Sequence, residues 1–250
     1  MARKLKNLLA NAIAILLWLG VWQIAAMLVG KEVILPSPIA VFGRFFELIF
    51  TKGLWQATFT SLTHIMGGYL AGVVIGVLLG MLMYFVSGMR IMFSPLLTVV
   101  KSTPVASFIL VAYFIITDTA IPVFITFLMV LPMIASTVFT ALKGTDKDLL
   151  EMASAYKFSF GDKLKTLYIP TVMPHLIGQA LTALGLGWKA GIAAEVLCTP
   201  RGTIGTYLYS AKNYLETVDT FAYTVLVVLI SLCLELVLKK LLRKAFGGAA

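Results

Sequence analysis

Charged residues are scarce in this sequence. Asp, Glu, Lys and Arg account for 12% of the 250 residues, whereas hydrophobic residues account for 60%. Soluble domains carry about twice that share of charge, so a soluble fold of this composition could not cover its surface with polar groups. The composition therefore predicts that much of the surface faces lipid. Because no polar stretch is long enough for a second folded unit, we expect a single membrane domain over residues 1–250.

Residues that hold metals or carry out catalysis are also rare. There are two histidines and two cysteines. His64 and His175 do not have the spacing of metal ligands, and Cys198 and Cys233 are far apart and typical of apolar helix positions. The sequence lacks a Gly-x-x-x-x-Gly-Lys-Ser/Thr loop that would hold nucleotide phosphates, and no nucleophile stands beside a base. We therefore expect no catalytic residue, no metal site and no cofactor in this chain.

What the sequence does have is a series of long apolar stretches. A helix needs about 20 mostly apolar residues to cross a bilayer. Six stretches qualify, at residues 8–29, 66–86, 91–116, 120–142, 172–197 and 221–238. The first is too long for the core of a cleaved signal peptide, so we expect an uncleaved anchor. The third is interrupted at Lys101-Ser102-Thr103-Pro104. Residues 39–50, with Arg44 and Glu47, are too short and too charged to span, and predict an interfacial helix.

The net charge of +9 could indicate a nucleic-acid partner, but its distribution indicates a membrane protein. If the N-terminus is cytoplasmic, the inner segments contain Arg3, Lys4, Lys6, Arg90, Lys143, Lys147, Lys157, Lys163, Lys165, Lys239, Lys240, Arg243 and Lys244. The outer segments then contain only Lys31, Arg44, Lys52, Arg201 and Lys212. Cytoplasmic loops are enriched in Lys and Arg. We therefore expect both termini in the cytoplasm, the lipid bilayer as a partner and no nucleic acid.

Small residues recur at helical spacing in two of the spans. Gly68, Gly72, Gly76 and Gly80 follow one another every four residues, and Gly187 and Gly191 repeat the pattern in the fifth span. Such faces allow close helix–helix approach in lipid. They predict either packing within the subunit or an interface between subunits.

The inner loop at residues 145–170 has the pattern of a short helical hairpin. Thr145 with Asp148 and Ser159 with Asp162 fit capping boxes, which predict two helix starts, and Pro170 is expected to close the hairpin. Leu149, Ala153 and Tyr156 are spaced along one helical face. An apolar face on a cytoplasmic hairpin favours docking to a cytoplasmic partner.

Residues in this hairpin resemble a known motif. Glu151-Met152-Ala153 followed by Ile169-Pro170 resembles the Glu-Ala-Ala loop of permease subunits of bacterial ATP-binding-cassette (ABC) importers. Met152 stands in place of the family's first alanine and Lys157 in place of its glycine. Further matches extend over residues 35–240 and resemble the nitrate/sulfonate/taurine branch of this family of binding-protein-dependent transport inner-membrane components. These matches are Leu35-Pro36-Ser37-Pro38, Ser94-Pro95-Leu96-Leu97, Pro104-Val105-Ala106 and Gly187-Trp188-Lys189-Ala190-Gly191 to Glu195.

The resemblance implies an all-α type I ABC importer permease in a bacterial inner membrane. It implies a second permease copy, two ATPase subunits that bind ATP and Mg, and an extracytoplasmic substrate-binding protein. It also implies that the coupling residues are Glu151, Met152, Ala153, Lys157 and Pro170. We expect Glu151 to cap or ion-pair within the hairpin, and a larger residue at 153 to clash with the ATPase. Two alternatives are a stand-alone secondary transporter or channel, which would favour inverted repeats, and a membrane-embedded enzyme.

Three ionisable residues lie inside predicted spans: Lys101, Lys189 and Glu195. Charges at membrane depth are costly and normally face water or a partner. We expect these residues and Pro104 to contribute to a translocation path or gate; a structural contact of Lys101 to backbone carbonyls near Pro104 is the alternative. The lysines favour a small anion such as a sulfonate, taurine or nitrate, whereas Glu195 favours a neutral or cationic vitamin precursor.

Overall fold

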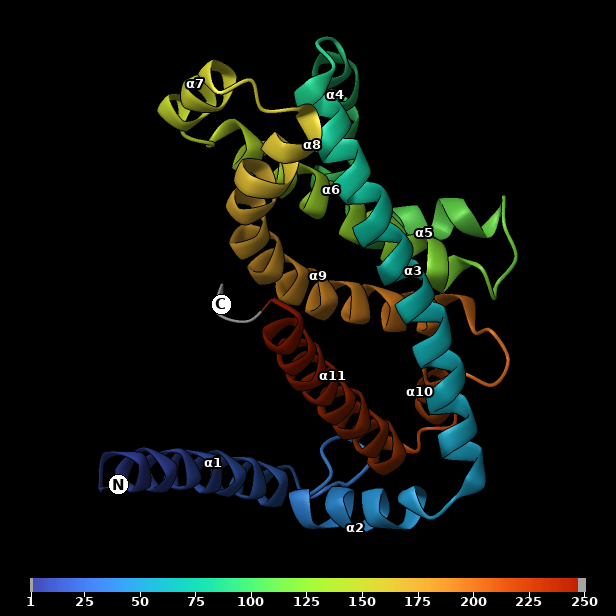
Figure 1. The fold of residues 1–250 in the computed structure, drawn as a ribbon. Coiled ribbons are helices and arrows are strands. Elements are labelled where there is room, and N and C mark those ends of the chain that lie inside the picture. The colour runs from blue at the N-terminus through green and yellow to red at the C-terminus, as the bar shows by residue number, and fades with distance from the viewer. Residues whose placement is uncertain (1, 247–250) are drawn as a thin grey trace.

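The computed structural model describes residues 2–246, and these residues form helices and connecting segments without any strand. Residue 1 and residues 247–250 of the predicted domain lie outside the described part. The elements are α1 Ala2–Val29, α2 Pro38–Ile49, α3 Lys52–Phe85, α4 Met89–Ser102, α5 Val105–Tyr113, α6 Ile121–Lys143, α7 Lys147–Ala155, α8 Phe160–Lys163, η1 Leu164–Tyr168, α9 Ile169–Cys198, α10 Ile204–Asn213 and α11 Thr217–Phe246. Figure 1 shows their arrangement.

Five helical stretches within residues 2–246 are long and apolar enough to cross a membrane, and the total is six if the bent pair α4 and α5 counts as one span. This agrees with the predicted number of about six. Two of the helices begin well before the predicted spans that they contain. Helix α3 begins at Lys52 and not at residue 66, because the polar residues before 66 lower hydropathy without breaking a helix. The fifth stretch begins at Phe160, well before residue 172.

The expected closure of the hairpin at Pro170 is wrong. Helices α8, η1 and α9 follow one another without a break, and Pro170 lies in the first turn of α9. A proline is tolerated there because its missing N–H is not needed. The preceding turn is π-helical, with the N–H of Ile169 bonded to the carbonyl of Leu164. A π turn of this kind inserts one extra residue and leaves the helix continuous.

The interruption predicted at residues 101–104 is a sharp bend. Helices α4 and α5 meet at 100°. Thr103 is extended (φ −82°, ψ 133°), which is the conformation that a following proline favours. Pro104 then starts α5. The third predicted span is therefore a pair of helices with the geometry of a broken span or of a re-entrant loop.

The centre of the subunit is formed by α3, α6 and α9. The face of α3 that carries Gly68, Gly72, Gly76 and Gly80 is buried against α6. A Cβ added at Gly72 would lie 2.8 Å from the Cβ of Val130 on α6. Both glycine faces therefore pack within the subunit, since a Cβ at Gly191 would lie 2.6 Å from the side chain of Ile65.

Helix α1 extends away from this centre and meets the rest of the chain near α2 (Figure 1). The indole N–H of Trp22 donates to the carbonyl of Pro36 over 3.0 Å, and the Trp22 ring lies 5.8 Å from that of Phe221 on α11. Large apolar side chains on α1, such as Trp18 and Leu28, are exposed. They require lipid or another protein chain as a neighbour.

Helix α2 covers the residues that were predicted to form an interfacial helix. Ser37 caps it by accepting a hydrogen bond from the N–H of Ala40 over 3.2 Å. The guanidinium of Arg44 on this helix donates to both carboxylate oxygens of Asp219 on α11, over 2.7 and 3.0 Å. The hydrogen bonds to Asp219 and Glu47 raise the pKa of Arg44 above its ordinary value. This ion pair joins α2 to the start of the last span.

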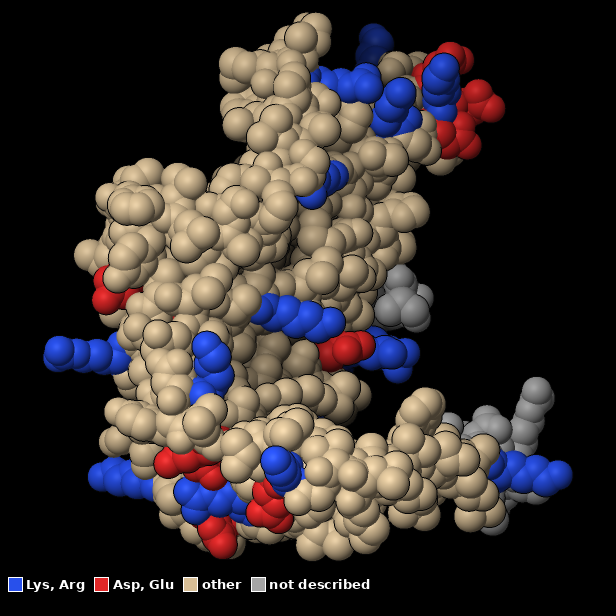
Figure 2. Space-filling view, turned by 180° about the vertical axis from the view of Figure 1, so that it is seen from behind, with Lys and Arg blue, Asp and Glu red and all other residues tan. Residues whose placement is uncertain are grey.

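Charged side chains are unevenly distributed over the surface. Figure 2 shows them over the end of the molecule that carries α7 and over the end that carries α2, with further blue and red side chains at mid-height.

Candidate functional site

A polar groove runs between α6 and α9. Its lining residues are Ser136, Thr137, Thr140 and Ala141 from α6, Gly144 directly after α6, and Thr171, His175 and Gln179 from α9. On each helix the polar residues recur at a spacing of about four, which places them on one face. The two faces meet because α6 and α9 pack along each other. The groove is thus lined by hydroxyl, imidazole and amide groups that belong to two otherwise apolar helices.

Lys101 reaches this groove from α4. Its Nζ donates a hydrogen bond to the hydroxyl of Ser136, and that hydroxyl donates to the carbonyl of Pro132. Lys101 is exposed. The alternative of a contact to backbone carbonyls near Pro104 is wrong, because the partner of the ammonium is a side chain on α6. Pro104 itself is exposed at the bend, three residues beyond Lys101.

Lys189 lies on an exposed stripe of α9. The exposed residues of this helix include His175, Thr182, Leu186, Lys189 and Ala193, spaced by the three or four residues of one helical face. Lys189 follows His175 by about 21 Å at the helical rise of 1.5 Å per residue. The structure therefore places Lys101 and Lys189 at different levels of the subunit.

Glu195 is not on that exposed stripe. Its side chain is fully buried and its Oε2 accepts hydrogen bonds from the hydroxyl of Ser61, over 2.7 Å, and from the N–H of Gly205, over 3.2 Å. The expectation that Glu195 faces the path or gate is wrong. It faces α3 and the start of α10, because α9 turns its small-residue side, including Ala194, into the core. Its Oε1 has no hydrogen-bond partner among the described residues.

The hairpin at residues 145–170 has one predicted cap and one different cap. Ser159 and Asp162 form the expected capping box at the start of α8. Helix α7, however, is capped by Asp146, whose carboxylate accepts from the N–H of Asp148 over 2.9 Å. Thr145 does not cap it, because the helix starts one residue later and the Thr145 side chain is buried.

The faces of α7 also differ from the prediction. Ala153 is fully buried, and Leu150 packs on the same side against the core of the subunit. Ala153 thus lies at the buried edge of the face that it shares with Leu149 and Tyr156, which are exposed together with Met152. A larger residue at 153 would clash within this subunit first, so the expected clash with the ATPase is misplaced.

Glu151 is exposed on α7 and forms no hydrogen bond or ion pair with the side chains that the structure describes. The expectation that it caps or ion-pairs within the hairpin is therefore wrong. The cross-link inside the hairpin is instead the hydrogen bond from the Nζ of Lys163 to the hydroxyl of Ser154, over 2.9 Å. Glu151 remains available to a neighbour outside the subunit.

Helix α7 ends in a Schellman motif. Lys157 has a positive φ of 54°, the left-handed conformation that favours glycine. The N–H of Phe158 bonds to the carbonyl of Ala153, and the N–H of Lys157 bonds to that of Ser154. This explains in physical terms why a glycine would suit position 157, where this chain has lysine.

The hairpin is joined to α3 by aromatic contacts. The ring of Tyr168 lies 5.8 Å from that of Tyr84 and 5.4 Å from that of Phe85, and Phe160 lies 5.3 Å from Phe85. Edge-to-face pairs at these distances are favourable. The end of α3 and the start of the fifth span are therefore held together where the hairpin emerges.

A family model decides what kind of protein this is. The model described as "Binding-protein-dependent transport system inner membrane component" matches residues 72–246. The chain belongs to this family. It is a multi-pass permease subunit of the inner membrane, with the fold of ABC importer permeases.

Curated proteins similar to this permease cover nearly all of it. It is 25% identical to the taurine transport system permease protein TauC of Escherichia coli (strain K12), over 93% of this chain and 86% of TauC. It is 27% identical to the nitrate import permease protein NrtB of Synechococcus elongatus, over 84% of this chain and 78% of that one. It is also 27% identical to the riboflavin transport system permease protein RibX of Chloroflexus aurantiacus, over 89% and 83%.

Solved structures confirm the type I importer fold. The permease matches a chain of a bacterial ABC transporter that imports the acidic polysaccharide alginate with a TM-score of 0.66 at 15% identity, over 97% of this chain and 96% of that chain. It matches a chain of the MetNI methionine ABC transporter with a TM-score of 0.63 at 18% identity, over 77% and 95%.

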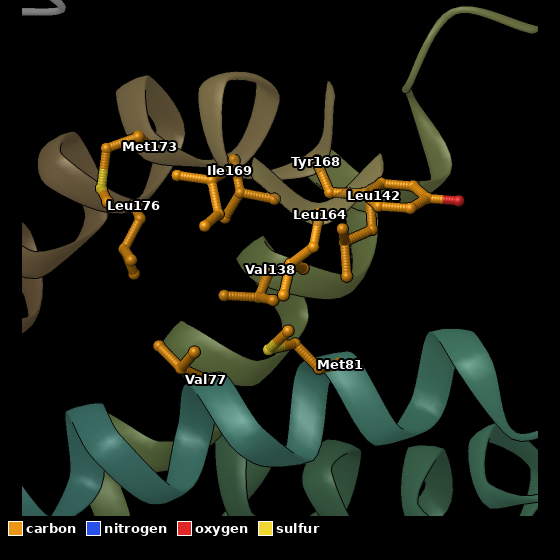
Figure 3. A pocket seen from close by; sticks show the side chains of 10 residues that line it. Val77, Met81, Val138, Leu142, Leu164, Tyr168, Ile169, Met173 and Leu176 are labelled. Carbon is orange, nitrogen blue, oxygen red and sulfur yellow. The ribbon is translucent and has the colours of Figure 1, made fainter. Parts of the chain in front are cut away.

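A second pocket of the permease is entirely apolar. Figure 3 shows side chains of α3, α6, η1 and α9 around it, including Val77, Met81, Val138 and Leu176. Its lining contains no charged side chain, and the surface that it exposes is apolar.

The sequence prediction missed the polar groove of this permease. It weighed only fully charged residues within spans and so found Lys101 without Ser136, Thr140, His175 or Gln179. The signal was nonetheless present, since hydroxyl, imidazole and amide groups recur every four residues in two consecutive predicted spans.

Proposed function

We propose that two copies of this permease form the pathway of an ATP-driven importer for a small oxyanion. The observation that carries the proposal is the pair of cations on exposed surface beside apolar spans, Lys101 at the α6–α9 groove and Lys189 on the exposed stripe of α9. An ammonium at membrane depth needs water or a partner. A water-filled path between two subunits meets this need and favours anions.

The ATPase partner docks, in this proposal, on the exposed side of α7. Leu149, Met152 and Tyr156 are exposed there, and exposed apolar side chains on a cytoplasmic hairpin are typical of a protein interface. Glu151 beside them is free for a polar contact. The ATPase, and not this chain, would bind ATP and Mg, since the sequence has no phosphate-binding loop.

A second copy is proposed because one subunit leaves two surfaces uncovered. These are the stripe of α9 that carries Lys189 and most of residues 12–29 of α1. In a two-fold dimer the same surfaces meet on both subunits. The bias of Lys and Arg toward the predicted inner segments supports a cytoplasmic location of both termini.

An extracytoplasmic binding protein would deliver the solute to the opposite side. A solved alginate transporter of the same fold is in complex with a periplasmic protein bound to an alginate pentasaccharide. Among the curated relatives, the names of TauC and NrtB specify taurine and nitrate. Together with the two lysines they support a sulfonate or nitrate as the solute.

A neutral or cationic vitamin precursor is the second candidate. It is favoured by the similarity to RibX, whose name specifies riboflavin. The burial of Glu195 removes the earlier argument for this candidate, since that carboxylate does not face the path. The lysines leave the oxyanion as the better supported solute.

The assembly can be tested by purifying the chain from its native membrane in mild detergent. We expect a native mass equal to two permease copies and two ATPase copies, and ATP hydrolysis that the loaded binding protein stimulates. An active monomer without an ATPase would contradict the proposal. Reconstituted vesicles should take up taurine or nitrate in preference to riboflavin.

The docking face can be tested in the same preparation. Met152→Asp should release the ATPase, because it places a charge in the proposed apolar contact, while the unfolding temperature of the permease stays unchanged. Ala153→Trp is the contrasting variant and should lower the unfolding temperature, because Ala153 is buried within the subunit. Normal ATPase retention by Met152→Asp would remove α7 as the docking site.

A further inference from the structure

We infer that the groove between α6 and α9 is a binding subsite for the oxyanion group of the transported solute. This inference deepens the proposed function and rests on it. It assigns a chemical role to six groove residues: Ser136, Thr137, Thr140, Thr171, His175 and Gln179.

The first argument is the chemistry of the lining. Hydroxyl and amide groups can each donate a hydrogen bond to an oxyanion. Thr140 and His175 are exposed toward the groove from opposite helices. A sulfonate or nitrate has three oxygens at fixed angles, so donors on two facing helices can bind it from both sides.

The second argument is charge. The Lys101 ammonium has three donor hydrogens and donates to Ser136 at the rim of the groove. The groove lining contains no Asp or Glu. Among the side chains that the structure describes, both ion pairs involve Arg44, far from Lys101. The charge of Lys101 is therefore not neutralised by a neighbouring carboxylate, and the groove favours an anion.

The third argument is position. The groove begins at Gly144, where α6 ends beside the cytoplasmic hairpin, and reaches Ser136, about 12 Å further along the helix. Hydrogen-bonding groups at that depth are costly to expose to lipid. The groove therefore opens toward water, on the cytoplasmic half of the path. A solute that has passed Lys189 would meet Lys101 and the groove before its release.

A transit site must bind weakly enough to release its solute. The hydroxyls of Ser136 and Thr171 already donate to backbone carbonyls, of Pro132 and Leu167. Part of the donor capacity of the groove is thus in use, and a dissociation constant on the order of millimolar is expected.

The test is cysteine labelling of the full-length permease in liposomes, without its ATPase. In a Cys233→Ser background, Thr140→Cys places a thiol in the groove; the remaining Cys198 is buried. The thiol is treated with 2-sulfonatoethyl methanethiosulfonate, an anion, and with 2-(trimethylammonio)ethyl methanethiosulfonate, a cation. Each rate is divided by the rate of the same reagent with 2-mercaptoethanol.

The expected result is a corrected rate about tenfold higher for the anionic reagent, because one nearby ammonium biases the local concentration of small ions. Lys101→Gln in the same background should abolish the preference. Lys189→Gln is the matched control and should preserve it, since Lys189 lies outside the groove. Taurine or sodium nitrate at 10–100 mM, on the order of the expected dissociation constant and above, should slow labelling, and choline should not.

Equal rates for the two reagents, a preference that survives Lys101→Gln, or no labelling by either reagent would each overturn the inference. Gln179→Cys, on the facing helix, provides an independent position if Thr140→Cys does not fold. The measurement needs no ATP hydrolysis, so it can detect an anion-selective groove even if the proposed importer assembly is rejected. The assembly can likewise be confirmed even if the groove shows no preference for anions.

Discussion

The carboxylate of Glu195 on α9 accepts a hydrogen bond from the hydroxyl of Ser61 on α3, over 2.7 Å, inside the protein. The same hydroxyl accepts from the N–H of Ile204, over 3.0 Å, and the carboxylate accepts from the N–H of Gly205. Two long spans and the first turn of α10 therefore meet at one buried polar cluster. Gly205 allows this approach, since a Cβ there would lie 2.7 Å from the N of Val196.

Ser61→Ala should destabilise the permease. It removes a donor from a buried carboxylate and an acceptor from the N–H of Ile204, and an unsatisfied buried polar group costs about 1–3 kcal/mol. Thermal unfolding in detergent should show a clear decrease in the transition temperature. Thr63→Ala is the matched control, because Thr63 is exposed and its hydroxyl bonds only to its own helix. Equal transition temperatures for the two variants would show that the cluster does not stabilise the fold.

Gly72→Ala should also destabilise the permease, through steric overlap. The added Cβ would lie 2.8 Å from the Cβ of Val130, and overpacking of this kind costs about 1–3 kcal/mol. Val130→Ala should recover part of the loss in the double variant. Gly67→Ala is the control on the same helix: it meets nothing within 4 Å and should stabilise by about 0.5–1 kcal/mol. A neutral Gly72→Ala variant would contradict the close packing of α3 on α6.

Lys157→Gly should stabilise the hairpin. Position 157 has a φ of 54°, and a non-glycine residue in that region costs about 1 kcal/mol. Hydrogen exchange of the α7 amides should become slower in the variant. Lys157→Ala should not give this gain, since alanine bears the same penalty as lysine. Faster exchange in Lys157→Gly would mean that the lysine side chain, and not the backbone, holds this turn.

Sequence patterns predicted the spans well because a bilayer imposes length and apolarity on each of them. They could not place the side chains that depend on helix rotation. Glu195 and Lys189 are six residues apart on α9, yet one is fully buried and the other exposed. Hydropathy does not distinguish these two positions. The neighbouring residues Ala194 and Gly191 face the core, but this is known only once the packing partner of the helix is known.

The hairpin shows the same limit on a smaller scale. The Ser159–Asp162 box was predictable because both halves are local. The choice of Asp146 over Thr145 as the cap of α7 was not predictable, because it depends on the burial of Thr145 in the folded subunit. In the same way, the bend at Thr103 follows from Pro104 alone, whereas the bond from Lys101 to Ser136 needs the packing of α4 on α6.

Lys101 and Lys189 should contribute differently to transport. In the proposed path, Lys189 attracts the anion from a distance, whereas Lys101 acts beside the groove that binds it. Lys189→Met should therefore lower uptake of a dilute anion by about tenfold, since steering by one charge is of this order. A higher concentration of the anion should restore the uptake. Lys101→Met should lower the maximal rate of uptake, because the anion loses a charged hydrogen-bond donor at a site that it must occupy.

The measurement is uptake of labelled taurine or nitrate by vesicles that contain the permease, its ATPase and its binding protein, over a range of salt concentrations. High salt should weaken the effect of Lys189→Met more than that of Lys101→Met if Lys189 acts through the long-range field. Normal uptake of the anion by both variants would remove the two lysines from the path and would leave the permease assignment intact, because the family match does not depend on them.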